Sequence, residues 1–410
     1  MNSEGYLKSS YMKILKDSLI YLVGEMLAKA MPFLLLPYLT RKLGTAGFGE
    51  LSYYQAAFSL LLIGFGMSQD GAVTRYYYIY GQRNLHSVVY AGALYTAFAA
   101  LIGLLAAWQL HSLALASVVC AAAAQTVLAT QLSLRQCRKQ ALAYTAIQFG
   151  SSLFTTVLTV WLLEMSADYP VERRFLALFA GNALVSLAAY LLYRRSAGQR
   201  LGFNRQRVWQ ALRYIFALGL PLVIHHAGNY VKGQFDRVVI YQGYSAATLG
   251  VYSAGYQTAS VLGVLLMALN KATVPYYYQA LRSGKITAAT VRRWALLSLL
   301  TAPLPAVVAW LMPERLFLWL LGAQYAGVHY YICLFLLGFG LTVPYYLQVN
   351  YLFYHAQNQR IALTSLLSAG GYLLVLLLTA RVGIQWVPLA MIAGNALIFP
   401  ILFRQVKPYG

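Results

Sequence analysis

Residues 18–44 read SLIYLVGEMLAKAMPFLLLPYLTRKLG, a run long enough to cross a bilayer that nonetheless contains Glu25 and Lys29. A charge near the middle of a spanning helix costs roughly 2.5 to 3.5 kcal/mol on insertion scales, so such charges normally face protein or water. Glu25 and Lys29 are four residues apart with the acid first, which allows an ion pair on one helical face. Pro32 and Pro37 remove backbone donors, which a membrane tolerates where neighbouring helices or cavity water satisfy the freed carbonyls. The run therefore predicts either a helix that faces a polar cavity or a buried structural ion pair.

The composition indicates a polytopic membrane protein. The chain has 410 residues, of which 60% are hydrophobic and 10% charged, and its mean hydropathy is +0.59. We expect an all-α fold with about twelve transmembrane helices of about 20 residues each. The first run is too long and too charged to be the h-region of a cleaved signal peptide. The expected spans cover residues 18–39, 47–68, 87–108, 112–134, 142–163, 175–193, 212–233, 248–269, 293–312, 328–350, 360–380 and 384–403.

The net charge of +21 indicates a membrane topology rather than nucleic-acid binding. With the N-terminus inside, 22 of the 31 Lys and Arg residues fall in inward loops and helix ends and 7 on the outward side, while Lys29 and Lys232 lie within spans. This bias follows the positive-inside rule and predicts that both termini are cytoplasmic. The surplus charge would also attract anionic headgroups. We therefore expect membrane lipids, and no nucleic acid, as partners.

The sequence contains no recognisable catalytic pattern. It has no Walker-type glycine loop, no HExxH pair, no paired carboxylates in outward loops and no serine or cysteine elbow. Its three cysteines, Cys120, Cys137 and Cys333, lie in expected spans or at a helix end, which argues against a disulfide framework or a metal site. We therefore expect a protein that is not an enzyme and that needs no metal or other cofactor.

A hydrophilic stretch at residues 194–213, the longest in the chain, separates two halves of about six spans each. We therefore expect one bundle over residues 1–200 and another over residues 201–410. At a constant offset of 201 residues several identical pairs follow one another, among them Gly49 with Gly250. Halves with an even number of helices would be parallel repeats, and transporters built this way bind substrate between the repeats. The sequence thus predicts two six-helix bundles around a central cavity.

The seventh expected span carries a stripe of polar residues. His225, Asn229, Lys232 and Asp236 are spaced 4, 3 and 4 residues apart, which places them on one face of a helix. Ionisable groups within a membrane typically mark a substrate or ion pathway. We expect this face to line the cavity, the alternative being a buried structural network. The stripe is flanked by His226, Tyr230 and Arg237.

Asp70 and Lys271 are equivalent under the 201-residue offset, and both lie at expected cytoplasmic helix ends. They are candidates for an ion pair that closes an inward gate, although charges at helix ends more commonly extend to water. The imidazole rings in the seventh span are a candidate for proton coupling.

Tyrosine is abundant, with 34 in the chain, and many are expected at the membrane interfaces. A phenol in a polar cavity also suits sugars, because the ring packs on a pyranose face while the hydroxyl bonds to its substituents. The best candidates for sugar contacts are Tyr21, Tyr230 and Tyr256. The other expected substrate-binding residues are Lys29, Lys232, Arg237, Lys271, His225 and Asn229.

The sequence resembles the Wzx-type polysaccharide-repeat (O-antigen) flippases at four motifs, namely PFLLLPYLTRKLG (32–44), FGELSYYQAAF (48–58), DRVVI (236–240) and GVYSAGYQTA (250–259). These flippases are part of the multidrug/oligosaccharidyl-lipid/polysaccharide exporter superfamily, with its MATE-like fold. Chain length, span number, central basic loop and six-plus-six arrangement agree over nearly the whole chain.

The resemblance implies that the protein moves an undecaprenyl-diphosphate-linked oligosaccharide from the inner to the outer leaflet of a bacterial cytoplasmic membrane by alternating access. It implies a place in O-antigen and lipopolysaccharide biosynthesis, with a glycan polymerase as partner. The cations would hold the diphosphate and the tyrosines the sugars. Because there is no ATP site, energy would come from a proton or sodium gradient or from consumption of the product outside. In that case Glu25, Asp70 and Asp236 are the acids that would carry the coupling proton or sodium ion.

Three other functions stay open. A multidrug exporter of the same superfamily would favour an acid-rich cavity, whereas lysines and histidines outnumber acids in the expected spans of this chain. A lipid II flippase would be expected to have additional helices. An integral membrane glycan polymerase or ligase would need larger outward loops.

Overall fold

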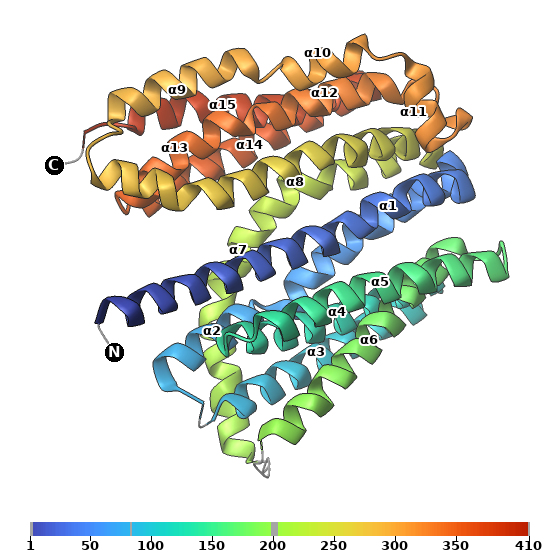
Figure 1. Ribbon diagram of the computed structural model, residues 1–410. Helices are drawn as coiled ribbons and strands as arrows, with labels where there is room; N and C mark the ends of the chain where they lie inside the picture. Colours follow the sequence, from blue (N-terminus) through green and yellow to red (C-terminus); the bar gives the residue numbers. More distant parts are fainter. Residues whose placement is uncertain (1–2, 83, 198–203, 409–410) are drawn as a thin grey trace. The chain divides into compact units, whose positions relative to one another are not determined.

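The computed structural model describes the backbone of residues 3–82, 84–197 and 204–408, and the side chains of residues 20–82, 84–192 and 204–408. This part of the chain consists of helices joined by turns and contains no strand (Figure 1). The predicted all-α fold is confirmed. A helix suits a membrane because it satisfies its own backbone hydrogen bonds.

The helices are named in chain order, as in Figure 1. They are α1 (Ser3–Gly66), α2 (Gln69–Tyr80), α3 (Leu85–Gln109), α4 (Leu113–Cys137), α5 (Ala141–Met165), α6 (Pro170–Ala197), α7 (Arg205–Gly243), α8 (Ala246–Arg282), α9 (Ala288–Thr301), α10 (Leu304–Leu311), α11 (Glu314–Leu321), the 3₁₀ helix η1 (Ala323–Tyr325), α12 (Val328–Gly340), α13 (Thr342–Tyr354), α14 (Asn358–Val382), η2 (Ile384–Trp386) and α15 (Leu389–Gln405).

Eleven helical segments of the described chain are long and apolar enough to cross a membrane. The first, Ile20–Tyr80, has 61 residues, which at about 1.5 Å per residue is about three times the thickness of a bilayer core. Within it, α1 bends at Gly44, whose φ of 67° and ψ of −176° are not helical. Glycine adopts such angles without steric cost. Because the two arms of α1 hold the first two predicted spans, the structure agrees with about twelve spans.

The chain divides into two compact units. The first unit comprises Met1–Leu35 and Tyr54–Ala227, and the second unit comprises Leu36–Tyr53 and Gly228–Gly410. The helices α1 and α7 therefore each contribute to both units. The predicted boundary between residues 200 and 201 lies outside the described residues, as does much of the predicted central basic loop.

In the first unit, α4 lies at the centre and packs against α2, α3, α5 and α6. Half of its most apolar stretch is buried, more than in any other described span. Ala121 and Ala122 are fully buried and let the neighbouring helices approach closely. The hydroxyls of Thr126 and Thr130 donate to carbonyls four residues earlier on the same helix. Thus α4 is the scaffold on which the other helices of this unit pack.

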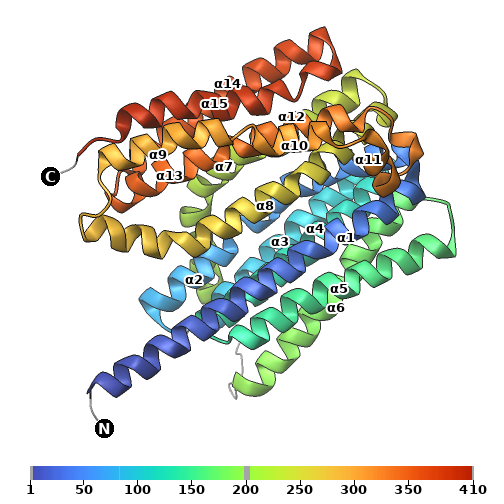
Figure 2. The ribbon, with the colours of Figure 1, turned by 45° about the horizontal axis from the view of Figure 1, so that its top comes forward.

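The second unit includes the bend of α1. Tyr325 of η1 is fully buried, and its hydroxyl donates a 2.9 Å hydrogen bond to the carbonyl oxygen of Gly44. The ring of Phe48 is also buried and meets the Tyr325 ring edge-on at 6.3 Å. Elsewhere in this unit α8 packs on α12, and α14 and α15 lie side by side (Figures 1 and 2). One tyrosine therefore holds the bent backbone by a hydrogen bond and a ring contact.

The bent segment of α1 crosses α8 at two glycines. A Cβ atom added to Gly49 would overlap the carbonyl of Ala246, and one added to Gly250 would overlap the carbonyl of Thr45. Thr45 and Ala246 are separated by 201 residues, as are Gly49 and Gly250, so the contact is reciprocal. Reciprocal contacts are expected where a two-fold axis relates two elements. At this crossing the backbones touch, and only glycine fits.

We predict that Gly49→Ala or Gly250→Ala lowers the stability of the protein by about 1 to 3 kcal/mol, the usual cost of overpacking, because backbone atoms block the new methyl group. Thermal unfolding of the purified protein in detergent measures the effect. Gly64→Ala on α1 is the matched control, since a Cβ there meets nothing within 4 Å. Equal melting temperatures for Gly49→Ala and Gly64→Ala would contradict the close crossing.

Candidate functional site

The predicted ion pair on α1 is present in the first unit. The Nζ atom of Lys29 lies 2.7 Å from Oε1 of Glu25, and the two side chains are 36% and 28% exposed, respectively. Other residues of the same stretch of α1 pack closely against α5. The Ser152 hydroxyl of α5 donates to the Ala28 carbonyl at 2.9 Å, and Gly24 lies against Thr145 of α5. The pair is therefore partly open and not enclosed by the protein.

Tyr21, one turn before Glu25, packs on the same neighbour. Its ring meets that of Tyr144 on α5 edge-on, with 5.0 Å between the ring centres. The ring contact fixes the position of Tyr21 close to the ion pair along α1. This places a predicted sugar-binding residue and a predicted diphosphate-binding residue on one stretch of helix.

The predicted stripe lies on α7, which is helical from Arg205 to Gly243 despite Pro221. The rings of His225 and His226 are 5.7 Å apart, and both residues are exposed, as is Asn229. Lys232 is partly buried and has no hydrogen bond or ion pair to any described residue. This ammonium group is therefore the member of the stripe that most needs a partner from outside the described chain.

The far end of the stripe is a buried network in the second unit. Asp236 and Arg237 are 3% and 6% exposed, and Oδ1 of Asp236 lies 3.1 Å from Nη1 of Arg237. The guanidinium also donates to the Gly233 carbonyl at 2.8 Å and lies 4.5 Å from the centre of the Tyr256 ring. The Tyr252 hydroxyl donates to Oδ2 of Asp236. The network ties α7 to α8 and satisfies both charges within the protein, as a buried pair requires.

Tyr252 was missed by the sequence analysis, although it lies one helical turn before Tyr256 on the same helix. It is almost fully buried, and its ring contacts Phe335 of α12 at 5.1 Å, as does the ring of Tyr256. Tyr230 on α7 is also buried. The i, i+4 spacing of the two α8 tyrosines was the available signal, but their shared carboxylate–guanidinium partner was not visible from spacing alone.

Asp70 and Lys271 belong to different units, and each is exposed. Asp70 lies in the first turn of α2, where a negative charge is favoured by the helix dipole. Next to Lys271 on α8, Asn270 accepts a 2.7 Å hydrogen bond from Asn350 of α13. The proposed gate between the two charges stays a prediction.

Several polar contacts of the first unit were also missed. The Ser151 hydroxyl donates to Asn182 at 2.6 Å, and Asn182 donates to Gln125 at 2.7 Å, which links α5, α6 and α4. The guanidinium of Arg135 donates to the Ala189 carbonyl at 2.6 Å. In the sequence, uncharged amides such as Asn182 and Gln125 within apolar runs were the signal that could have predicted contacts between these helices. Among the described residues no three His, Cys, Asp or Glu side chains come together as a metal site would require.

Removing one partner of the buried Asp236–Arg237 pair should lower the stability of the protein far more than removing both partners. We predict that Asp236→Leu lowers stability by about 3 to 5 kcal/mol, because it leaves the Arg237 charge buried without a counter-ion. The double variant Asp236→Leu/Arg237→Met should recover much of the loss. Thermal unfolding in detergent compares the two, with Lys232→Met as the control for loss of a partly buried charge. A double variant no more stable than the single variant would contradict the assignment.

The chain is similar in sequence to one known protein family and to two proteins of Haemophilus influenzae. The polysaccharide biosynthesis protein family matches residues 14–281, more than half of the chain. Protein 1 of the Lsg locus of Haemophilus influenzae is 43% identical over 392 residues, covering 96% of this chain and 98% of that protein. A second Haemophilus influenzae protein, described as an uncharacterized membrane protein, is 43% identical over 396 residues, covering 97% and 98%.

Two solved structures share the fold. The MATE transporter VcmN of Vibrio cholerae in its bent form has a TM-score of 0.58 at 14% identity and covers 97% of each chain. The lipid II flippase MurJ in an inward closed conformation also has a TM-score of 0.58, at 10% identity, covering 98% of this chain and 87% of that one. At these identities the likeness concerns the fold alone. The chain is thus a multi-pass membrane protein with a MATE-like fold, and it belongs to the polysaccharide biosynthesis protein family.

Proposed function

We propose that this protein is a flippase that moves a lipid-linked oligosaccharide from the inner to the outer leaflet of a bacterial cytoplasmic membrane by alternating access. The proposed cargo is an undecaprenyl-diphosphate-linked repeat unit of O-antigen, which a glycan polymerase would use outside in lipopolysaccharide biosynthesis. Family membership and the MATE-like fold support a transport role. The single observation that carries the proposal is Lys232, a cation within a span that has no partner in the described chain.

An ammonium group within a membrane span is costly unless an anion or water accompanies it. The acid one turn away from Lys232 is Asp236, and this carboxylate is engaged by Arg237 and Tyr252. The charge of Lys232 is thus left for an anion that arrives with the substrate. Lysine commonly binds phosphate as a point charge. A diphosphate, which hydrocarbon alone would exclude, is the cargo that this lysine fits best.

The ion pair on α1 supports a mechanism for coupling. A diphosphate that approaches Lys29 would compete with Glu25 for its ammonium group, since both ligands are anionic oxygens. Displacement would leave the Glu25 carboxylate to take up a proton or a sodium ion. Substrate binding and ion uptake would then be linked at one partly exposed pair.

The polar side chains around these cations suit the sugars. His225 and Asn229 present donors or acceptors on an exposed stretch of α7. We assign sugar contacts to these residues and to Tyr21, Tyr230 and Tyr256. Arg237 and Asp236 we assign to holding α7 on α8, because their polar atoms are already engaged. Asp70 and Lys271 keep the proposed role in an inward gate.

Export of organic cations is the second candidate, because MATE transporters share the fold. Such a cargo needs a carboxylate that is not already neutralised. Glu25 is paired with Lys29, and Asp236 with Arg237. The charges on these helices therefore favour an anionic cargo.

We predict that Lys232→Ala and Lys29→Ala each slow the translocation of an undecaprenyl-diphosphate-linked oligosaccharide by about tenfold or more, because a hydrogen bond to a charged group contributes about 1.5 to 3 kcal/mol. An external lectin added to proteoliposomes measures how much glycan reaches the outer leaflet. Lys285→Ala is the matched control, since this lysine is exposed and lies outside the spans. Unchanged rates in both the Lys29 and the Lys232 variant would contradict the role of the lysines, and no translocation by the wild type would contradict the flippase.

We predict that Glu25→Gln uncouples transport, because the amide keeps the shape of the carboxyl group but cannot take up a proton or a cation. In proteoliposomes with an imposed proton or sodium gradient, the wild type should move glycan faster than without a gradient. The variant should show one slow rate under both conditions. Equal gradient dependence in the two proteins would exclude Glu25 as the coupling acid.

A further inference from the structure

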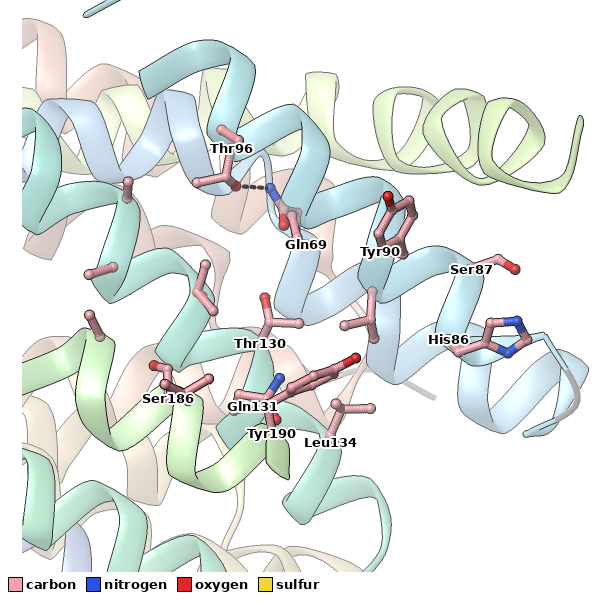
Figure 3. A pocket seen from close by; sticks show the side chains of 18 of the residues that line it. Gln69, His86, Ser87, Tyr90, Thr96, Thr130, Gln131, Leu134, Ser186 and Tyr190 are labelled. Carbon is pink, nitrogen blue, oxygen red and sulfur yellow. Dashed lines mark hydrogen bonds between the residues drawn. The ribbon is translucent and has the colours of Figure 1, made fainter. Parts of the chain in front are cut away.

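A groove in the first unit lies on α4 between α3 and α6. Its volume is about 730 Å³, within the range of about 300 to 1,000 Å³ that is usual for ligand sites. None of its lining residues is acidic. Figure 3 shows Thr130 and Gln131 of α4 between Tyr90 and Thr96 of α3 on one side and Ser186 and Tyr190 of α6 on the other. The groove is mostly apolar, with a few uncharged polar groups along its floor.

The groove has the length of one leaflet. It extends along α3 from His86 to Ala97, which is about 17 Å at about 1.5 Å per residue, or roughly half of a bilayer core. Tyr90 and Leu187 line it and are also 46% and 54% exposed. In a membrane protein such exposed apolar walls face lipid, so the occupant comes from the hydrocarbon phase.

Two buried polar side chains in the groove have no partner. Gln131 and Ser186 are 3% and 5% exposed, and neither makes a hydrogen bond to any described residue. Gln69 at the same groove is satisfied, since its amide donates to the Phe65 carbonyl at 2.8 Å and to Thr96 at 3.0 Å. A buried polar group without a partner is unfavourable. The Oε1 atom of Gln131 and the Oγ atom of Ser186 are enclosed by the protein, whereas the Gln131 amide nitrogen is a donor without a partner among the described residues. An occupant that offers an acceptor at the depth of Gln131 would satisfy this donor.

One end of the groove is basic. His86 and Asn204 line this end, and Arg207 follows Asn204 by three residues on α7. The Arg207 guanidinium donates a 3.4 Å hydrogen bond to Asn84, which directly precedes α3. Ser186 lies one helical turn before Tyr190 on α6, and Gln131 lies nearly one turn before Leu134 on α4. The unsatisfied pair is thus about one turn, or about 5 Å, inward from this end.

We propose that the groove binds one anionic glycerophospholipid of the bilayer. One acyl chain would lie between the apolar walls, a glycerol ester oxygen would accept a hydrogen bond from the amide nitrogen of Gln131, and the phosphate would lie near His86 and Arg207. Basic pockets between transmembrane helices are known to hold anionic headgroups. A polyprenyl chain fits less well, because it has only hydrocarbon inward of its diphosphate and would leave the Gln131 amide nitrogen without an acceptor.

Native mass spectrometry of the full-length protein in detergent tests the proposal, with phosphatidylglycerol, phosphatidylcholine and undecaprenyl phosphate as separate probes. Ala183→Phe fills the groove, and Gln131→Leu removes its amide. Gln348→Leu is the matched control, because Gln348 is a fully buried glutamine of the second unit whose amide also has no partner among the described residues. Melting temperatures without added lipid show that each variant is folded.

We expect one tightly held phosphatidylglycerol on the wild type, with affinity about tenfold weaker in Ala183→Phe and Gln131→Leu and unchanged in Gln348→Leu. Equal binding of phosphatidylcholine would overturn the assignment of the phosphate to the basic end. Loss of undecaprenyl phosphate rather than phosphatidylglycerol in Ala183→Phe would assign the groove to the cargo lipid instead. Equal binding in all variants would place the lipid elsewhere. Because no transport is measured, each outcome is independent of the flippase proposal.

Discussion

Hydrocarbon offers no hydrogen bonds, so every polar group that enters it must find its partner within the protein, and this constraint accounts for most of the described contacts. Backbone groups are paired by folding into helices. Hydroxyls such as those of Ser52 and Thr126 donate to carbonyls of their own helix. The buried charges of Asp236 and Arg237 neutralise each other and are completed by Tyr252. Because the partners of these two charges come from both helices, the network also holds α7 on α8.

The same constraint gives the first helical hairpin its unusual form. The helix α1 bends at Gly44 and delivers residues 36–53 to the second unit, while its flanks remain in the first. Tyr325 donates to the carbonyl of Gly44, and burial raises the pKa of this phenol, so it stays a neutral donor. The glycine crossing of α1 and α8 then brings the two backbones into direct contact. A helix shared by both units is suited to a protein in which two repeats are proposed to move.

The exceptions to the constraint are the informative positions. Lys232 in the second unit, and Gln131 and Ser186 in the first, are partly or fully buried polar side chains without partners in the described chain. The Lys232 ammonium group calls for an anion, whereas the amide nitrogen of Gln131 suits an ester oxygen. The proposed diphosphate and the proposed phospholipid follow from this difference. Ligands are thus expected where an unsatisfied polar group also carries a charge or lines a groove.

The sequence by itself determined what depends on spacing along one helix. Apolar runs of about 20 residues set the spans, the i, i+4 spacing of Glu25 and Lys29 set their ion pair, and the 201-residue offset related the two glycines that meet at the crossing. Only the tertiary structure decided which helices are neighbours. The pairing of Asp236 and Arg237 depends on Tyr252 and Tyr256 from α8, and the groove needs α3, α4 and α6 together. The physical reason is that helix geometry is local and repeats with a fixed period, whereas packing joins residues far apart in the chain, which no spacing rule specifies.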